Sequence, residues 1–395
     1  MPRSKLTFIA IACWTILLAA VCIKPLFAPT SGTVFITYLK AGEEFSAGRP
    51  LYNVIHPFTD NYRYPPIVAV GFVPFTLLPP GFGSVVWRLI GVAGFLTGLA
   101  AWARHLRPEV SVPVLFLLAL PLSVGSLSNA QANTHVAGLM LWGSVLACRG
   151  NWFSAALLVA AATTFKGYPI ALGGLLALLA PVRFGLPLIL GVAAGFALPY
   201  AFQSPEYITT QYQLLFDNLG NDDRSSRPLF AGYQDFHMLL RVFGINIPRN
   251  DYAYVQAATG LAAAGLILWL RFRGMSRSDA ALNALAIGLC WMCVFNPAIE
   301  ASTYILMAPL MAFELVPARR PLWVKLAAYS GGGLFLLSVI VFAFPHAIHQ
   351  PVIALGVLPM GAALIAIATI ARTVMSRPAL ATPATTAEPP LRQAA

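Results

Sequence analysis

Charged residues are scarce in this chain. Of its 395 residues only 10% are Asp, Glu, Lys or Arg, and 58% are hydrophobic. Soluble domains carry about 25% charged residues, so the composition excludes an ordinary soluble protein and is typical of a membrane protein. The net charge of +11 arises largely from basic residues in short gaps between apolar segments, where they set orientation and meet anionic lipid. No nucleic-acid partner follows from it.

Cysteines are also few, and the common nucleotide-binding sequence motifs are absent. The five cysteines lie in or beside apolar segments, so a disulfide framework is not expected. Neither a P-loop nor a Gly-x-Gly-x-x-Gly fingerprint occurs in the sequence. The usual loops that hold nucleotide phosphates are therefore missing, which favours a lipid-linked ligand over a nucleotide-linked one.

What the chain has instead is a series of apolar segments long enough to cross a bilayer. They predict an all-α polytopic membrane protein with about twelve transmembrane helices. The expected helices cover residues 6–27, 83–103, 111–127, 134–148, 152–166, 168–182, 184–202, 253–271, 279–295, 302–317, 323–344 and 351–371. One further apolar segment, 66–78, is short and bounded by proline pairs, so we expect a short helix against the outer leaflet.

The distribution of charge predicts the orientation in the membrane. Basic residues occupy alternate gaps, which should therefore be cytoplasmic; they include Arg3, Lys5, Arg104, Arg107, Arg149, Arg183, Arg271, Arg273, Arg277, Arg319, Arg320, Lys325, Arg372 and Arg377. Both termini are then cytoplasmic, and two long segments, 28–82 and 203–252, form outward loops. Residues 1–375 make one polytopic domain, and residues 376–395 are expected to form a disordered cytoplasmic tail.

Several motifs occur in an order that resembles a known family. Phe35, Tyr38, Ala41, Gly48, Pro50 and Tyr52 are followed by Tyr64-Pro65-Pro66 and the proline-bounded apolar helix. Later in the chain come Ala130-Gln131-Ala132-Asn133, Thr164-Phe165-Lys166-Gly167-Tyr168-Pro169 and Asn296-Pro297. The series resembles glycosyltransferase family 87, which belongs to the GT-C superfamily of polytopic sugar transferases.

The resemblance implies a fold and an activity. The fold would be GT-C-like, and the activity would be transfer of a hexose or pentose from a polyprenyl-phosphate donor to a glycolipid or cell-envelope glycan. The reaction would take place at the outer face of the cytoplasmic (inner) membrane. A transporter or flippase that binds the same lipid-linked sugar without bond chemistry is the alternative.

Such a reaction needs positive charge or aligned donors at the phosphate that leaves with the lipid. Lys166, which the resemblance matches to the family's lysine, is one candidate, and Arg63 and Arg241 are others. Each of these cations also has a simpler interpretation as a side chain that reaches water or lipid headgroups. Gln131 and Asn133, together with Tyr64, complete the expected substrate-binding set.

An acceptor hydroxyl is a weak nucleophile and needs a general base. The resemblance implies an aspartate at the start of the first outer loop, but this chain has Val34, which cannot accept a proton. Asp60 and Glu300 are the nearest substitutes, and we expect one of them to be the base. Either the base is displaced to such a carboxylate or the chemistry differs from that of the family.

No cofactor is expected. Asp222 and Asp223 are adjacent carboxylates that hard cations favour, but the polar residues around them indicate a solvated turn instead.

Overall fold

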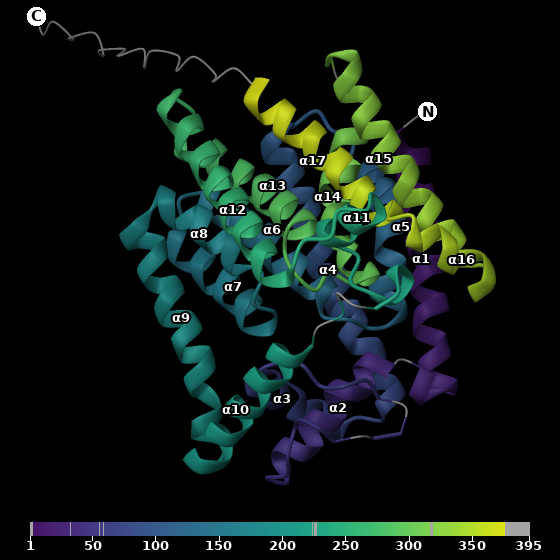
Figure 1. Ribbon diagram of the computed structural model, residues 1–395, viewed down its shortest axis with the longest axis vertical. Coiled ribbons are helices and arrows are strands. Elements are labelled where there is room, and N and C mark those ends of the chain that lie inside the picture. Colours follow the sequence, from purple (N-terminus) through teal and green to yellow (C-terminus); the bar gives the residue numbers. More distant parts are fainter. Residues whose placement is uncertain are drawn as a thin grey trace, which may run out of the picture.

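The structure is a computed structural model that describes residues 3–31, 33–54, 56–57, 59–222, 224, 227–316 and 319–375. Asp223 and the predicted tail at 376–395 lie outside the described residues. Within them every regular element is a helix (Figure 1), as expected for an all-α protein.

The α-helices are α1 (Arg3–Phe27), α2 (Thr33–Ser46), α3 (Pro66–Phe72), α4 (Pro80–Leu106), α5 (Val112–Ser128), α6 (Asn133–Cys148), α7 (Trp152–Phe165), α8 (Ile170–Leu179), α9 (Leu186–Ala197), α10 (Pro205–Asn221), α11 (Phe236–Val242), α12 (Arg249–Phe272), α13 (Arg277–Val294), α14 (Ala308–Leu315), α15 (Leu322–Val341), α16 (His346–Ala354) and α17 (Val357–Met375). Shorter 3-10 or π-helical segments are η1 (Pro29–Ser31), η2 (Val73–Leu77), η3 (Pro181–Gly185), η4 (Leu198–Ala201), η5 (Leu229–Ala231) and η6 (Ala301–Met307).

Six helices of the described chain are long and apolar enough to cross a membrane. They are Ser4–Phe27, Pro80–Leu106, Pro181–Ala201, Arg249–Phe272, Leu322–Val341 and Val357–Met375. The other predicted spans are also helical, but they are shorter or less apolar, so the total of twelve stays a prediction. The last predicted span differs from the structure, because the chain breaks between α16 and α17 at Gly356, whose φ of 71° lies in the left-handed region that glycine favours.

The bundle is held together by close helix crossings. A Cβ added to Gly138 on α6 would lie 2.8 Å from the carbonyl carbon of Gly94 on α4, so the two backbones meet where only glycine fits. This crossing fixes α4 against α6, and these two helices carry the residues that shape the turn at Gln131.

A separate layer of helices packs across one end of the bundle. Figure 1 shows α2, α3 and α10 gathered at the lower end of the view, away from the amino terminus of α1 and the carboxyl ends of α12 and α17. This layer has an aromatic core made by Phe35, Tyr38, Tyr52 and Phe72, into which Trp87 of α4 projects. The two segments expected as long outer loops are therefore largely helical, and the aromatic core fixes the first of them to the bundle.

Candidate functional site

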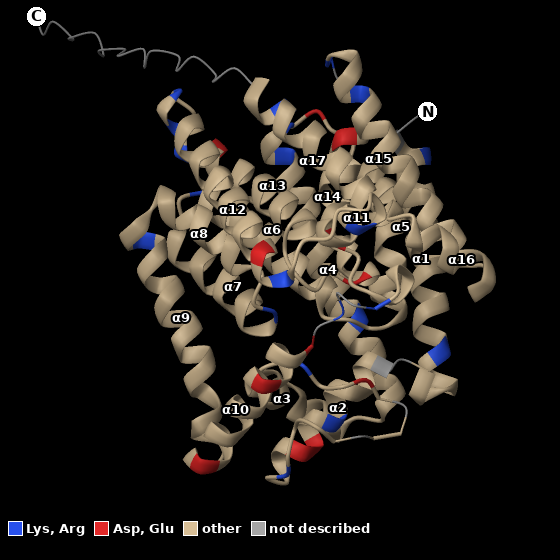
Figure 2. Ribbon diagram, in the orientation of Figure 1, with Lys and Arg blue, Asp and Glu red and all other residues tan. Residues whose placement is uncertain are grey.

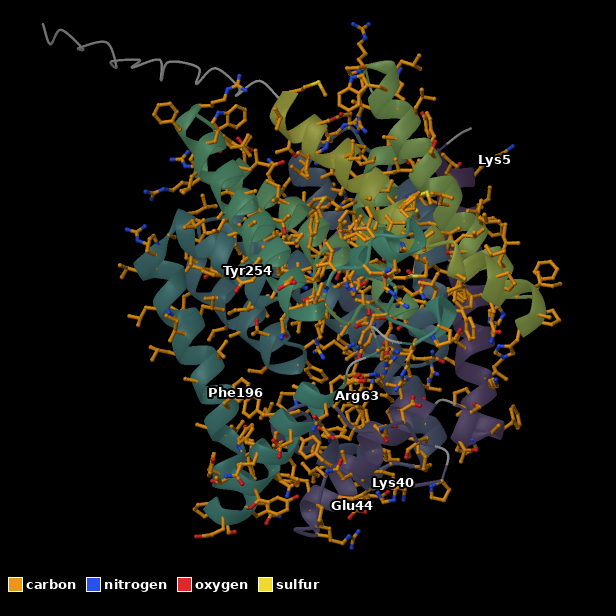
Figure 3. The ribbon with its side chains drawn as sticks, viewed as in Figure 1. Lys5, Lys40, Glu44, Arg63, Phe196 and Tyr254 are labelled. Carbon is orange, nitrogen blue, oxygen red and sulfur yellow. The ribbon has the colours of Figure 1, made fainter. Side chains whose placement is uncertain are left out.

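A cavity of about 900 Å³ lies where the α2–α3–α10 layer meets the ends of the bundle helices. Figure 2 shows acidic and basic residues mixed at this junction, and Figure 3 places Arg63 there, with Phe196 of α9 at the same level of the view. Polar residues of its wall include Thr37, Asp60, Arg63, Tyr64, Gln131, Lys166, Tyr168, Asp222, Arg224, Tyr233, Asn296 and Glu300. Six of the eight predicted site residues thus meet in one cavity.

The turn between α5 and α6 brings Gln131 into the wall. Ala130 has a φ of 51°, and its carbonyl accepts a hydrogen bond from Trp87 Nε1 at 2.9 Å. Arg88, which is only 3% exposed, donates to the Leu127 and Ser128 carbonyls at 2.7 and 2.9 Å. A cation at the negative end of α5 is stabilised by the carbonyls of its last turn, and it holds the turn in place.

Gln131 and Asn133 have different positions relative to the cavity. Gln131 Oε1 accepts from Asn133 Nδ2 at 2.7 Å and from Ser302 Oγ at 2.8 Å, which leaves the amide nitrogen of Gln131 for a ligand. Asn133 is fully buried, and its Oδ1 accepts from the Tyr168 hydroxyl at 3.2 Å. Asn133, expected in the substrate-binding set, is therefore not part of the cavity wall, because its amide lies behind the wall and orients Gln131.

Lys166 follows directly after α7. Pro169 disfavours a helical conformation at Tyr168, so α7 ends at Phe165 and Lys166 is extended. Its ammonium lies 5.6 Å from the centre of the Tyr64 ring, a cation–π distance. No described residue forms an ion pair or hydrogen bond with Lys166, so its charge is not neutralised by the protein around it.

Two arginines and two carboxylates form a charge network in the cavity wall. Arg63 lies 3.3 Å from Asp222 and 3.8 Å from Glu300, and Arg224 lies 3.4 Å from each of the same carboxylates. The Tyr233 hydroxyl donates to Asp222 Oδ2 at 2.5 Å. Burial alone raises the pKa of Asp222, but the hydrogen bond from Tyr233 and the two guanidinium groups outweigh it and hold that pKa below its usual value.

This network corrects the expectation for Asp222, which the sequence indicates as part of a solvated turn. Its side chain is only 16% exposed and is bound on three sides. The loop after η5 is fixed to the Glu300 loop because Gln234 N–H donates to the Ile299 carbonyl at 2.7 Å. Within the described chain no group of three His, Cys, Asp or Glu side chains is placed to hold a metal ion.

Asp60 and Val34 lie on the same side of the cavity. The backbone N–H of Asp60 donates to Thr37 Oγ1 at 2.9 Å, and Thr37 lies one helical turn after Val34 on α2. Val34, Thr37 and Asp60 all line the cavity, and Asp60 is exposed. The structure therefore brings a carboxylate to the face of α2 where the resemblance implies one.

Arg241 does not reach the main cavity. It donates to the Arg227 carbonyl at 2.9 Å and lines a small neighbouring cavity, so this candidate for the leaving phosphate is not in the wall of the main cavity. Sequence reasoning missed Arg224 and Tyr233, because no local pattern links the 222–233 loop to Arg63. Thr37 carried a usable signal, since it falls on the same helical face as Val34.

The matches to known proteins agree with the motif series. A model of glycosyltransferase family 87 matches residues 62–297. No match to the chain was found among curated proteins. Among solved structures the chain is similar to ArnT from Cupriavidus metallidurans in the apo state, with 16% identity over 92% of this chain and 78% of that one and a TM-score of 0.40. The same protein bound to undecaprenyl phosphate gives 15% identity over 91% and 78%, with a TM-score of 0.38.

The family match begins after Asp60, so it leaves out Val34 and the motif at 35–52, but it contains Gln131, Lys166 and Asn296. It covers more than half of the chain. This multi-pass membrane protein belongs to glycosyltransferase family 87.

Proposed function

We propose that the protein transfers a sugar from a polyprenyl-phosphate donor to a glycan or lipid acceptor of the cell envelope, at the outer face of the cytoplasmic membrane. The observation that carries this proposal is the main cavity itself. It combines a lysine without a carboxylate partner among the described residues, an exposed aspartate and an apolar wall.

Lys166 is the group that we assign to the donor phosphate. Arg63 and Arg224 each face two carboxylates, so their charge is already balanced, whereas that of Lys166 is available. As the glycosidic bond breaks, negative charge grows on the phosphate oxygens, and a fixed cation there stabilises the transition state more than the ground state. The amide of Gln131 and the ring of Tyr64 lie in the same wall and would orient the donor.

An apolar surface beside the charged residues suits the prenyl chain. Phe196 of α9 and Leu215, Phe216 and Leu219 of α10 line the cavity, and Phe216 and Leu219 are 62% and 44% exposed. Apolar side chains that stay exposed next to a polar pocket commonly mark a binding surface. The lipid would lie along α9 and α10 while its phosphate reaches Lys166.

Asp60 is our preferred general base. It would accept the proton of the acceptor hydroxyl while that oxygen attacks the anomeric carbon and the lipid phosphate leaves. Glu300 is the second candidate, but one of its oxygens already faces both Arg63 and Arg224. We infer that Glu300 and Asp222 hold the two arginines in position, with Asn133 and Arg241 supporting the neighbouring loops.

We place the cavity outside the cytoplasm from the distribution of charge. The predicted cytoplasmic gaps carry most of the basic residues, and the α2–α3–α10 layer lies at the end of the molecule opposite the amino terminus of α1 and the carboxyl terminus of α17 (Figure 1). The positive-inside rule then puts both termini in the cytoplasm.

Val34 in the cavity wall favours one alternative, a flippase that moves the lipid-linked sugar without bond chemistry. Cells that lack the protein distinguish the two functions. Loss of a transferase leaves the lipid-linked sugar in the outer leaflet, where an impermeant oxidant such as periodate reaches its diols, and one glycan lacks a sugar. Accumulation in the inner leaflet, protected until the cells are opened, would overturn the transferase and support the flippase.

A further inference from the structure

A small second cavity adjoins the main one. Its volume is about 50 Å³, and its wall includes Tyr233, Asp235, His237, Arg249 and Tyr252. Tyr233 and Arg249 also line the main cavity, so the two cavities share a wall and a ligand in one borders the other. A space of this size with polar groups in its wall holds one or two water molecules or a single hydroxyl-bearing substituent of a ligand.

Tyr252 in this wall has an unused hydrogen-bonding group. Its side chain lies in the first turn of α12 and is 4% exposed, and its buried hydroxyl donates to no acceptor among the described residues, although the backbone N–H of His237 approaches its oxygen. The nearby tyrosines differ, because Tyr233 donates to Asp222 and Tyr304 donates to the Gln234 carbonyl, both at 2.5 Å. A buried hydroxyl that donates no hydrogen bond destabilises a protein, so Tyr252 calls for an acceptor that the described residues do not supply.

Acceptors lie around the same cavity. Asp235 is 6% exposed and accepts the Met238 N–H at 2.9 Å at the start of α11, and the backbone N–H groups of Asp235 and His237 also approach its carboxylate. A carboxylate has about four acceptor sites, so it can still accept from another donor. His237 Nε2 donates to the Ile247 carbonyl at 2.7 Å, so Nδ1 is the ring atom able to accept a hydrogen bond. The His237 and Tyr252 rings are 4.9 Å apart. A donor beside two acceptors matches a hydroxyl group, which both accepts and donates.

We propose that this side cavity binds one hydroxyl group of a sugar ring. The Tyr252 hydroxyl donates a hydrogen bond to the oxygen of that group, and Asp235 accepts a hydrogen bond from it. The sugar belongs either to the lipid-linked donor or to the acceptor, because both can carry sugar hydroxyls. The inference rests on the proposed function and adds to it a subsite that recognises the sugar rather than the phosphate. Binding of the sugar satisfies Tyr252, so the subsite selects against ligands that lack the hydroxyl.

The test compares Tyr252→Phe with Tyr254→Phe in the purified full-length protein. Tyr254 is on the same helix, is 76% exposed and lines neither cavity, and Figure 3 labels it. We expect Tyr252→Phe to raise the KM of one substrate roughly three- to tenfold, the loss of one hydrogen bond, while its melting temperature is unchanged or higher. Tyr254→Phe should change neither quantity. Which KM rises, that of the donor or that of the acceptor, identifies the source of the hydroxyl.

Deoxy analogues of that substrate complete the test. One analogue should raise KM in the wild type but not further in Tyr252→Phe, because both changes remove the same hydrogen bond. Asp235→Asn, which keeps a side chain suited to begin α11, should show the same non-additivity. If the wild type is active and Tyr252→Phe leaves both KM values unchanged, the subsite is overturned and the proposed function stands. A fall in the melting temperature of Tyr252→Phe leads to the same conclusion. No turnover by the wild type overturns both.

Discussion

The backbone N–H of Asp60 donates to Thr37 Oγ1 at 2.9 Å. This hydrogen bond brings Asp60 to the face of α2 that carries Val34. If Asp60 is the base, Asp60→Asn keeps the shape of the side chain and removes its ability to take a proton. Turnover should fall about 100- to 10,000-fold with donor affinity retained. Glu300→Gln should lower it less. Rates and donor binding, measured in proteoliposomes, separate the two effects.

Asp217→Asn is the matched control, because Asp217 is an exposed carboxylate on α10 outside the cavity. Full turnover in both Asp60→Asn and Glu300→Gln would contradict a displaced base. If the wild type is inactive and Val34→Asp is active, the chain is a transferase that has lost its catalytic activity.

Lys166→Ala should slow release of polyprenyl phosphate roughly a hundredfold or more, if the ammonium acts like an oxyanion-hole donor. Lys24→Ala removes an exposed lysine at the end of α1, outside the cavity, and should have no effect. Rates measured at saturating donor report the chemical step rather than binding. Equal rates in Lys166→Ala and Lys24→Ala would remove Lys166 from the mechanism.

The charge network predicts a pH-dependent contribution to stability. Because the folded-state pKa of Asp222 is lowered, its ionised form stabilises the protein above the unfolded pKa, and this contribution is lost as the pH falls through the folded pKa. Thermal melts should show wild type more stable than Asp222→Asn at pH 7, with the difference shrinking below about pH 4. Asp217→Asn should show no such change. A difference that stays constant down to pH 3 would mean that the charge of Asp222 does not stabilise the fold.

Orientation is tested by labelling with a membrane-impermeant thiol reagent on intact cells. Cysteines at Gln213 and Arg227, which are exposed on the cavity side, should react, whereas cysteines at Glu109 and Arg277 should react only after the cells are opened. The wild type, with its five native cysteines, gives the background. Labelling of Glu109→Cys or Arg277→Cys in intact cells would reverse the topology and move the cavity to the cytoplasm.

Much of the fold can be predicted from the sequence, because the local hydrophobicity of a segment indicates whether it forms a membrane helix. The apolar segments predict the helices α4 to α9 closely, and the proline pairs predict the short helix at α3. The break before α17 was not predicted, because a glycine in a left-handed conformation, such as Gly356, cannot be distinguished in sequence from a glycine within a helix.

The site was only partly predictable for a different physical reason. Lys166 and Gln131 stand at helix ends within recognisable motifs, so their position follows from the topology. The pairing of Arg63 with Asp222 depends on how the 222–233 loop packs against Glu300, which no local pattern encodes. Asn133 shares a motif with Gln131, yet its amide faces Tyr168 instead of the cavity, because positions two residues apart at a helix start point in different directions.

The most direct test of the central claim uses the purified protein in proteoliposomes, with a polyprenyl-phosphate sugar labelled in the sugar and a mixture of envelope glycans and lipids as acceptors. No nucleotide sugar is added. We expect the wild type to release polyprenyl phosphate and transfer the label to an acceptor, and Asp60→Asn and Lys166→Ala to do so far more slowly. Tight binding of the lipid-linked sugar with movement across the bilayer, and no labelled product from any acceptor, would contradict it.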